Sequence, residues 1–187
     1  MPTKMDYIVV VDLEATCWVS RGEGHSEIIE VGVCKLDHSG RIMQPRSLYV
    51  WPLRDSTELS RYCTELTGIT TTTLKQQGMP FEGVVNILVM DYGTKNRIIA
   101  TWGDYDKIEV YNQCKNMGLS SPFGPTHLNV KNLHAWLRHT RPKGLSAALK
   151  LEGLKFEGTP HSGKDDAVNT ARLLHHILQE RYVDDIG

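Results

Sequence analysis

The sequence lacks several features that would define the class of protein at once. No apolar run approaches the roughly 20 residues that a helix needs to cross a bilayer, which argues against a membrane protein. The four cysteines are widely spaced and form no C-x-x-C pair, which argues against a zinc ribbon or a disulfide scaffold. The N-terminus has no apolar signal-peptide core, so we expect a cytoplasmic protein that contacts no membrane.

An excess of charge of one sign is also missing. The formal net charge is -1, with acidic and basic residues mixed along the chain. A large nucleic-acid footprint usually needs a basic excess, so any nucleic acid is expected to be held locally, through metal ions and a few side chains. The length of 187 residues and the hydrophobic content of 40% fit one folded unit, and we expect a single domain over residues 1–187.

What the sequence does contain is a buried strand that leads into two acids. Residues 7–11 are all β-branched or aromatic, which is typical of a strand buried on both faces. Residues two apart in an extended chain point to the same side, so Asp12 and Glu14 are expected to face one direction. Like charges placed in this way raise one another's pKa unless a cation neutralises them. A D-x-E pair alone is more often a solvated strand end, so residues elsewhere in the chain must decide between the two interpretations.

The rest of the pattern predicts an α/β layered domain with a mixed sheet. A polar loop is expected over 19–26. Glu30 is a charged residue within the β-rich segment that follows, where an apolar residue would be usual. An exposed strand face and a role near Asp12 and Glu14 explain this glutamate equally well. The expected strands are 7–11, 27–37, 42–50, 97–103 and 126–130, and the expected helices are 60–69, 70–78, 80–93, 104–117, 130–138, 145–151 and 164–181.

Two more acids fall at the ends of expected elements. Asp104 follows the strand 97–103, and Asp166 lies in the first turn of the last helix. Ligand sites in open α/β sheets lie at the carboxyl ends of strands, and Asp12 and Asp104 share such an edge if their strands are parallel neighbours. The commonest role of an Asp at position 104 is instead a helix N-cap. Oxygen ligands without a Cys or His cluster suit Mg²⁺ or Mn²⁺, and two such ions promote phosphodiester hydrolysis.

A histidine precedes the last of these acids. His161 lies five residues before Asp166, in a loop that contains glycine and proline. If the loop folds over the metal site, the imidazole can take a proton from an attacking water, because its pKa lies near neutrality. A loop histidine taken alone is more often merely exposed.

Three segments, taken in order, resemble the exonuclease motifs of the DEDDh family of 3′-to-5′ exonucleases. They are Asp12-Leu-Glu14, Trp102-Gly-Asp104 and His161-Ser-Gly-Lys-Asp-Asp166. The segments 12–17, 26–32 and 63–69 look like the Eri-1 and KapD-like branch, which includes exoribonucleases that trim the 3′ ends of histone mRNA and small RNAs. The resemblance extends over nearly the whole chain.

The resemblance implies a ribonuclease H-like fold of three layers, with a mixed and mostly five-stranded sheet flanked by helices. It implies that Asp12, Glu14, Asp104 and Asp166 bind two divalent cations, Mg²⁺ or Mn²⁺, and that His161 is the general base. Asp165 is adjacent to Asp166, and the family spacing from the histidine to the last acid selects Asp166.

The resemblance also suggests residues for the 3′-terminal nucleotide. Tyr105 either stacks on a base or is an ordinary packing residue. The other candidates are Leu13, Ala15, Thr16, Leu66, Thr67, Ile69 and His161.

The expected activity is hydrolysis of a single strand from its 3′ end, with RNA favoured over DNA and nucleoside 5′-monophosphates as the product. The expected partners are therefore the 3′ ends of single-stranded RNA or DNA, and the oligomeric state stays open. Two alternatives are a DNA-directed proofreading or repair exonuclease and a module that binds 3′ ends without cutting.

Overall fold

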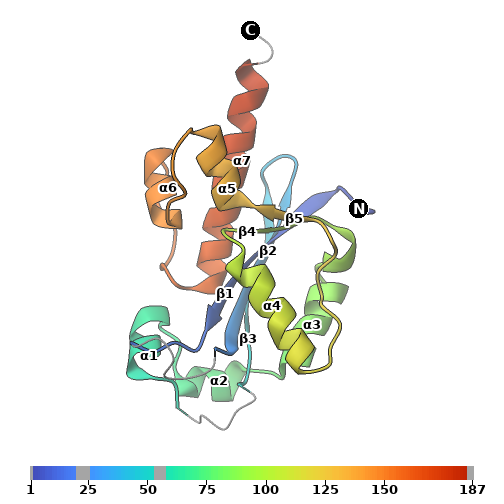
Figure 1. Ribbon diagram of the computed structural model, residues 1–187, viewed down its shortest axis with the longest axis vertical. Coiled ribbons are helices and arrows are strands. Elements are labelled where there is room, and N and C mark those ends of the chain that lie inside the picture. Colours follow the sequence, from blue (N-terminus) through green and yellow to red (C-terminus); the bar gives the residue numbers. More distant parts are fainter. Residues whose placement is uncertain (1, 20–25, 53–57, 185–187) are drawn as a thin grey trace.

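A five-stranded mixed sheet lies at the centre of the part of the chain that the structure, a computed structural model, describes: residues 2–19, 26–52 and 58–184. The strand order is β3-β2-β1-β4-β5 (Figure 1). Residues 20–25 of the expected loop lie outside the described ranges. The strands are β1 Tyr7–Ala15, β2 Ile28–Asp37, β3 Ile42–Tyr49, β4 Ile99–Thr101 and β5 His127–Asn129.

The direction of the strands brings two elements far apart in sequence to one edge. β2 is antiparallel to both β1 and β3, whereas β4 is parallel to β1, with Val9 opposite Ile99, and β5 is parallel to β4. The condition for a shared edge, that the first and fourth strands are parallel neighbours, is therefore met. β1 runs on to Ala15, so Asp12 and Glu14 lie within the strand instead of after it.

The helices form where the sequence patterns indicate, within a few residues at each end. The side chain of Ser60 caps the first helix by accepting from the Cys63 N–H, and Gly68 ends that helix with φ +72°. Thr70 caps the second helix through the Thr73 N–H. The helices are α1 Arg61–Thr67, α2 Thr71–Gln77, α3 Phe81–Met90, α4 Tyr105–Asn116, α5 Val130–Leu137, α6 Leu145–Leu151 and α7 Gly163–Asp184, with a 3₁₀ turn η1 at Thr94–Asn96.

The alternation of side chains along β1 creates two cores, one on each face of the sheet. Val9, Val11 and Leu13 pack against α3 and α4, and Val10 packs in the core formed with α5, α6 and α7. The helices thus cover both faces of the sheet (Figure 1). Asp12 and Glu14 lie two and four residues after Val10, so their side chains point to the same face of the sheet, the one covered by α5, α6 and α7.

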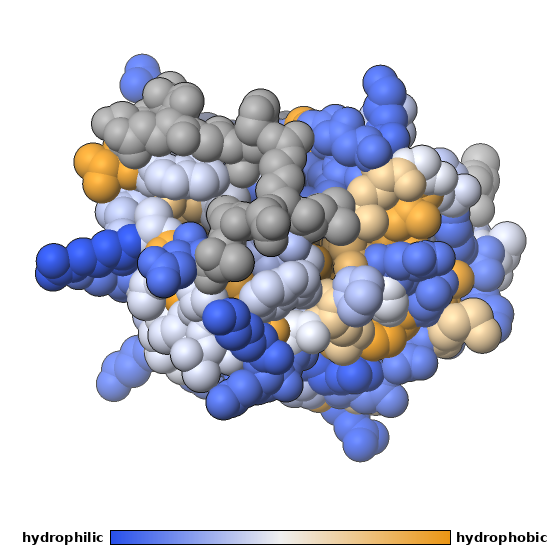
Figure 2. Space-filling view, turned by 90° about the horizontal axis from the view of Figure 1, so that it is seen from below, coloured by the Kyte–Doolittle hydropathy of each residue, from blue (hydrophilic) through white to orange (hydrophobic). Residues whose placement is uncertain are grey.

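Two further features describe the outside of the molecule. Within the described ranges, no helix is both long enough and apolar enough to span a membrane. Seen from below in Figure 2, the surface is largely hydrophilic, and hydrophobic side chains gather on the side where α3 and α4 lie in Figure 1. Met90 of α3 and Ile108 and Tyr111 of α4 are among the exposed hydrophobic residues.

Candidate active site

A pocket of about 310 Å³ opens where β1, α4, α5 and α7 meet. Asp12 and Glu14 of β1 line it together, as the spacing of two residues in a strand predicts. Asp106 of α4 and Asp166 of α7 line the same pocket. Four carboxylates from three elements therefore face one small space.

The third acid of this group differs from the one expected. Asp106 is only 6% exposed, and its Oδ1 accepts a hydrogen bond of 3.0 Å from the Leu13 N–H of β1. β1 pairs with β4 only at Val9 and Val10, so β4 does not extend far enough to offer a carbonyl to the Leu13 N–H. The Asp106 side chain accepts this hydrogen bond in its place. The bond fixes the Asp106 carboxylate beside Asp12 and Glu14.

Asp104 lies elsewhere, and the position expected for it beside Asp12 and Glu14 is occupied by Asp106. Its side chain is 58% exposed, and its Oδ1 lies 3.8 Å from Nδ1 of His127. Residues two apart at the start of a helix point to opposite sides, so Asp104 faces away from β1 when Asp106 faces toward it. As in the alternative interpretation, Asp104 occupies the N-cap position of α4, but its side chain forms no capping hydrogen bond among the described residues.

A signal for Asp106 was present in the sequence. The segment Gly103-Asp104-Tyr105-Asp106 offers two acids, and the expected strand end at Gly103 favoured the first. The second lies in the first helical turn, from which a side chain can reach back to the neighbouring strand.

The start of α7 is fixed to the sheet by a buried glutamate. Glu30 of β2 is 1% exposed, and its two carboxylate oxygens accept from the N–H groups of Gly163 (3.0 Å) and Lys164 (3.4 Å). Glu30 is also opposite Glu14 in the register of β1 and β2. The interpretation that Glu30 lies on an exposed strand face is therefore wrong.

The backbones of β2 and α7 also approach closely at this point. A Cβ atom at Gly32 would lie 1.8 Å from the carbonyl carbon of Gly163, so no other residue fits at position 32 without moving the helix. Glu30 and Gly32 together determine where α7 begins. They therefore also determine where Asp166, three residues into the helix, meets β1.

The loop before α7 carries His161 into the pocket lining. The backbone N–H of His161 donates to Asp166 Oδ2 at 2.8 Å, and its φ of 63° is unusual for a residue with a side chain. Asp165 faces the loop, where its Oδ2 accepts from the Thr159 N–H. The structure thus places Asp166, and not its neighbour, in the pocket.

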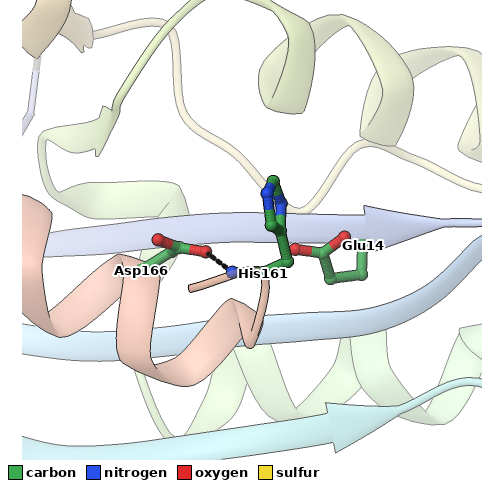
Figure 3. A group of neighbouring side chains, drawn as sticks. All are labelled: Glu14, His161 and Asp166. Carbon is green, nitrogen blue, oxygen red and sulfur yellow. Dashed lines mark hydrogen bonds between the residues drawn. The ribbon is translucent and has the colours of Figure 1, made fainter. Parts of the chain in front are cut away.

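Glu14, His161 and Asp166 lie close enough to share an ion. Each offers one ligand atom, and these atoms all lie within 4.8 Å of one another. In Figure 3 the two carboxylates lie on either side of His161, whose ring rises between them.

The carboxylates disfavour one another's charge. Burial first, and then the nearby Asp106 and Asp166, raise the pKa of Asp12 well above its ordinary value. Burial, then Asp166 and Glu30, raise the pKa of Glu14 to about 8. Burial raises the pKa of Asp106 to about 6, and burial raises the pKa of Asp166 to about 6 although His161 opposes the shift.

This donor set fits divalent cations. Four oxygen ligands with raised pKa values form a site that protons or cations must neutralise, and hard ions such as Mg²⁺ and Mn²⁺ prefer such oxygens. Among the described residues that line the pocket, Lys131 of α5 is the one ammonium group, and its charge opposes the rise in the pKa of Asp106. The sequence interpretation missed this lysine.

The residues expected to hold the terminal nucleotide separate into two groups. Leu13, Tyr105 and His161 line the pocket, and Tyr105 is 53% exposed. Ala15, Thr16, Leu66, Thr67 and Ile69 do not line it.

The residues outside the pocket contact other parts of the fold. Thr16 Oγ1 accepts from the Glu27 N–H, and Thr67 Oγ1 donates to the Cys63 carbonyl and accepts from the Ile69 N–H. Ile69 packs in a small core with Ile29. Thr67 and Ile69 therefore support α1, and a direct contact with a nucleotide is not supported for them.

The comparison with protein families places the chain in a class. Residues 9–174 match the family described as Exonuclease, of the RNase T type. Because this range covers most of the chain, the chain belongs to this exonuclease family.

Individual relatives agree with that class. The chain is 32% identical over 205 residues to human ERI1 exoribonuclease 2, a match that covers 94% of this chain and 29% of that protein. It is 31% identical to the 3′-5′ exonuclease Snipper of Drosophila melanogaster, covering 93% of this chain and 70% of Snipper. The chain thus spans less than a third of the length of the human relative.

A solved structure confirms the fold. The nuclease domain of 3′hExo, a DEDDh family member bound to rAMP, superposes with a TM-score of 0.84 at 30% identity, covering 96% of this chain and 95% of that domain. The ribonuclease H-like fold and the resemblance to DEDDh exonucleases of the Eri-1 type are therefore confirmed.

Proposed function

We propose that this chain is a metal-dependent 3′-to-5′ exonuclease that hydrolyses single-stranded RNA to nucleoside 5′-monophosphates. The observation that carries the proposal is the meeting of Asp12, Glu14, Asp106, Asp166 and His161 at one pocket. The name of the human relative, an exoribonuclease, supports RNA as the substrate, and the rAMP in the 3′hExo domain is a ribonucleotide.

The four carboxylates would hold two divalent cations, Mg²⁺ or Mn²⁺. When bound, such a pair supplies an activated water and stabilises the leaving oxygen of the phosphodiester. The chain contributes the positions of the ligands: β1 holds Asp12 and Glu14, the Leu13 N–H orients Asp106, and the His161 N–H orients Asp166.

His161 acts as the general base in this proposal. Its ring is exposed and lines the pocket, so it can accept the proton of the attacking water as the oxygen–phosphorus bond forms. The bond between phosphorus and the 3′ oxygen of the preceding nucleotide then breaks, and that oxygen takes up a proton from solvent to become the new 3′-hydroxyl. The phosphate stays on the 5′ oxygen of the released nucleoside. The hydrogen bond to Asp166 uses the backbone N–H of His161 and not its ring.

The terminal nucleotide occupies the space beside Leu13 and Tyr105. Tyr105 is half exposed at the pocket and can stack on a base of any sequence, a contact worth about 1–3 kcal/mol. Ala15, Thr16 and Leu66 stay predictions as outer contacts. Residues 1–187 are proposed to act as one exonuclease domain, and the four free cysteines fit the reducing environment of the cytoplasm.

The test is cleavage of 3′-labelled strands in Mg²⁺, with RNA, DNA and a duplex with a 3′ overhang compared at equal concentration. We expect RNA to be shortened to nucleoside 5′-monophosphates. Asp12→Ala should abolish cleavage because it removes a ligand on the central strand. A variant that cleaves as fast as the wild type would contradict the site, and equal or faster cleavage of DNA would contradict the substrate.

A second variant tests the role of the histidine. His161→Ala retains the backbone N–H that holds Asp166, so metal binding should persist while turnover falls by about 10²–10⁴-fold. Titration calorimetry measures the binding of Mn²⁺, and the rate at which nucleoside monophosphate forms measures turnover. Loss of Mn²⁺ binding in this variant would show that the histidine is a ligand instead of a base.

A further inference from the structure

Although the charges of the whole chain nearly balance, one segment of it contains no acidic residue. Between Glu109 and Glu152 the sequence contains no Asp or Glu, although the chain as a whole is slightly acidic. The mixing of acidic and basic residues along the chain is thus interrupted in this segment. Its basic residues are Lys115, Lys131, Arg138, Arg141, Lys143 and Lys150.

Two points of this segment lie at the pocket of four carboxylates. Lys131, in the first turn of α5, lines the pocket, and its Nζ lies close to Gly103, where an added Cβ would be 3.6 Å away. Leu145, the first residue of α6, lines the same pocket. The connection between α5 and α6 therefore leads back to the pocket.

The connection between α5 and α6 carries cations that are open to solvent. Arg141 and Lys143 are exposed, and Lys143 lies two residues before Leu145. Arg138 is committed to the fold instead, because it forms two hydrogen bonds, of 2.8 and 2.6 Å, with the buried Glu152. The available cations are thus Lys131, which lines the pocket, and Lys143 and Arg141, which lie in the connection that leads to Leu145.

The α4 side of the pocket has a different character. Asp106 and Glu109 accompany Lys107 there, and Ile108 is 52% exposed. Figure 2 shows hydrophobic side chains gathered on the side of α3 and α4. The other lysine of α4, Lys115, lies in its last turn, so a polyanion that leaves the pocket is attracted more strongly toward the α5 and α6 side than toward α4.

We propose that Lys131, Lys143 and Arg141 form a phosphate track, which binds the backbone of the single strand on the 5′ side of the terminal nucleotide. The inference rests on the proposed exonuclease function and adds where the rest of the substrate lies. Contacts to phosphates do not depend on the base, so the track holds strands of any sequence. It also gives long strands an advantage over short ones.

The experiment compares a dinucleotide, which ends before the outer track, with a strand of about 12 nucleotides, a length typical of single-strand grooves. The ratio of kcat/KM for the long strand to kcat/KM for the dinucleotide is measured for Arg141→Ala, Lys143→Ala and the double variant. Each single change should lower this ratio about 5-fold, as expected for one exposed ion pair. The slope of log kcat/KM against log salt should fall by about 0.7 for each phosphate contact removed.

Arg41→Ala is the matched control. Arg41 is exposed in the turn between β2 and β3, at the end of β2 away from Glu30. Its removal should leave both the ratio and the salt slope unchanged. If the track variants gave the same ratio as Arg41→Ala, the proposal would be overturned. It would also be overturned if kcat/KM fell equally for the long strand and the dinucleotide, because that result indicates damage to the pocket.

Binding separates this proposal from the proposed function. Fluorescence anisotropy of a labelled long strand in Ca²⁺ measures affinity without turnover. If the wild type cleaves no strand, the exonuclease assignment fails, and the track is still supported by weaker binding of the double variant or overturned by equal binding.

Discussion

A carboxylate bonded to the backbone of a neighbouring strand is held in place before any ion binds. Asp106 has this arrangement, through the Leu13 N–H, and Asp104 two residues earlier does not. A ligand that is already oriented loses less conformational entropy when the ion binds. The pair therefore offers one acid that lines the pocket and one matched control outside it in a single segment.

We expect Asp106→Asn to lower kcat/KM by about 10²–10³-fold, which corresponds to the loss of several kcal/mol of metal-assisted catalysis. Asp104→Asn should retain kcat/KM within about 2-fold, because this side chain is exposed and faces His127. Steady-state cleavage of a labelled strand measures both. The opposite ranking of the two variants would restore Asp104 as the ligand.

Among the elements, α7 depends on its attachment to β2. Glu30 supplies acceptors to the first N–H groups of the helix, which otherwise have no intrahelical partner. The negative carboxylate also faces the positive end of the helix dipole. The attachment joins residues 133 positions apart, and it holds the helix that carries Asp166 against β1.

We expect Glu30→Ala to lower the free energy of unfolding by about 2–4 kcal/mol, since it leaves buried N–H groups unpaired and a cavity. Glu30→Gln keeps one acceptor oxygen, and we expect less than half of that loss. Turnover should fall in the same order, because Asp166 shifts with the helix. Urea unfolding and strand cleavage provide the two measurements.

Glu82→Ala serves as the control for that series. Glu82 is an exposed acid in the first turn of α3, so its loss should change the unfolding free energy by no more than about 0.5 kcal/mol. If Glu30→Ala matched this control in stability and in turnover, the attachment would have no energetic role.

The sequence predicts elements well where the signal is local. The run of β-branched residues, the period of two that aligns Asp12 with Glu14, and the capping residues Ser60 and Thr70 all act over a few positions. Local signals of this kind do not decide whether β1 and β4 pair in parallel, as they do in the structure.

The errors concern properties that depend on side-chain direction or on distant contacts. The choice between Asp104 and Asp106 depends on where the first helical turn begins, a boundary that sequence patterns give only within a few residues. The burial of Glu30 depends on a helix that starts more than a hundred residues later. Neither property is encoded in a short window of sequence.

For the whole molecule, the crowded carboxylates connect stability to pH. The pKa of Glu14 is about 8 in the folded chain, against an ordinary value of 4.5. Between these two values the folded state retains a proton that the unfolded state has released. The unfolded state binds fewer protons, so stability decreases as pH rises through this window.

We therefore expect the melting temperature of the metal-free protein to fall between about pH 5 and about pH 8. Glu14→Gln should flatten this dependence and raise the melting temperature at the upper end by roughly 4–8 °C, equivalent to about 2 kcal/mol. Thermal unfolding in EDTA measures the effect. Added Mg²⁺ should stabilise the wild type more than the variant, and an unchanged pH slope in Glu14→Gln would contradict the assignment.

The contact between Gly32 and Gly163 also has a consequence for the order of synthesis. The ribosome makes β1 and β2 early, whereas Asp166 belongs to the last helix of the described chain. The four acids can come together only after α7 has emerged and settled against β2. A growing chain that has not yet reached residue 166 is therefore without its full set of acids.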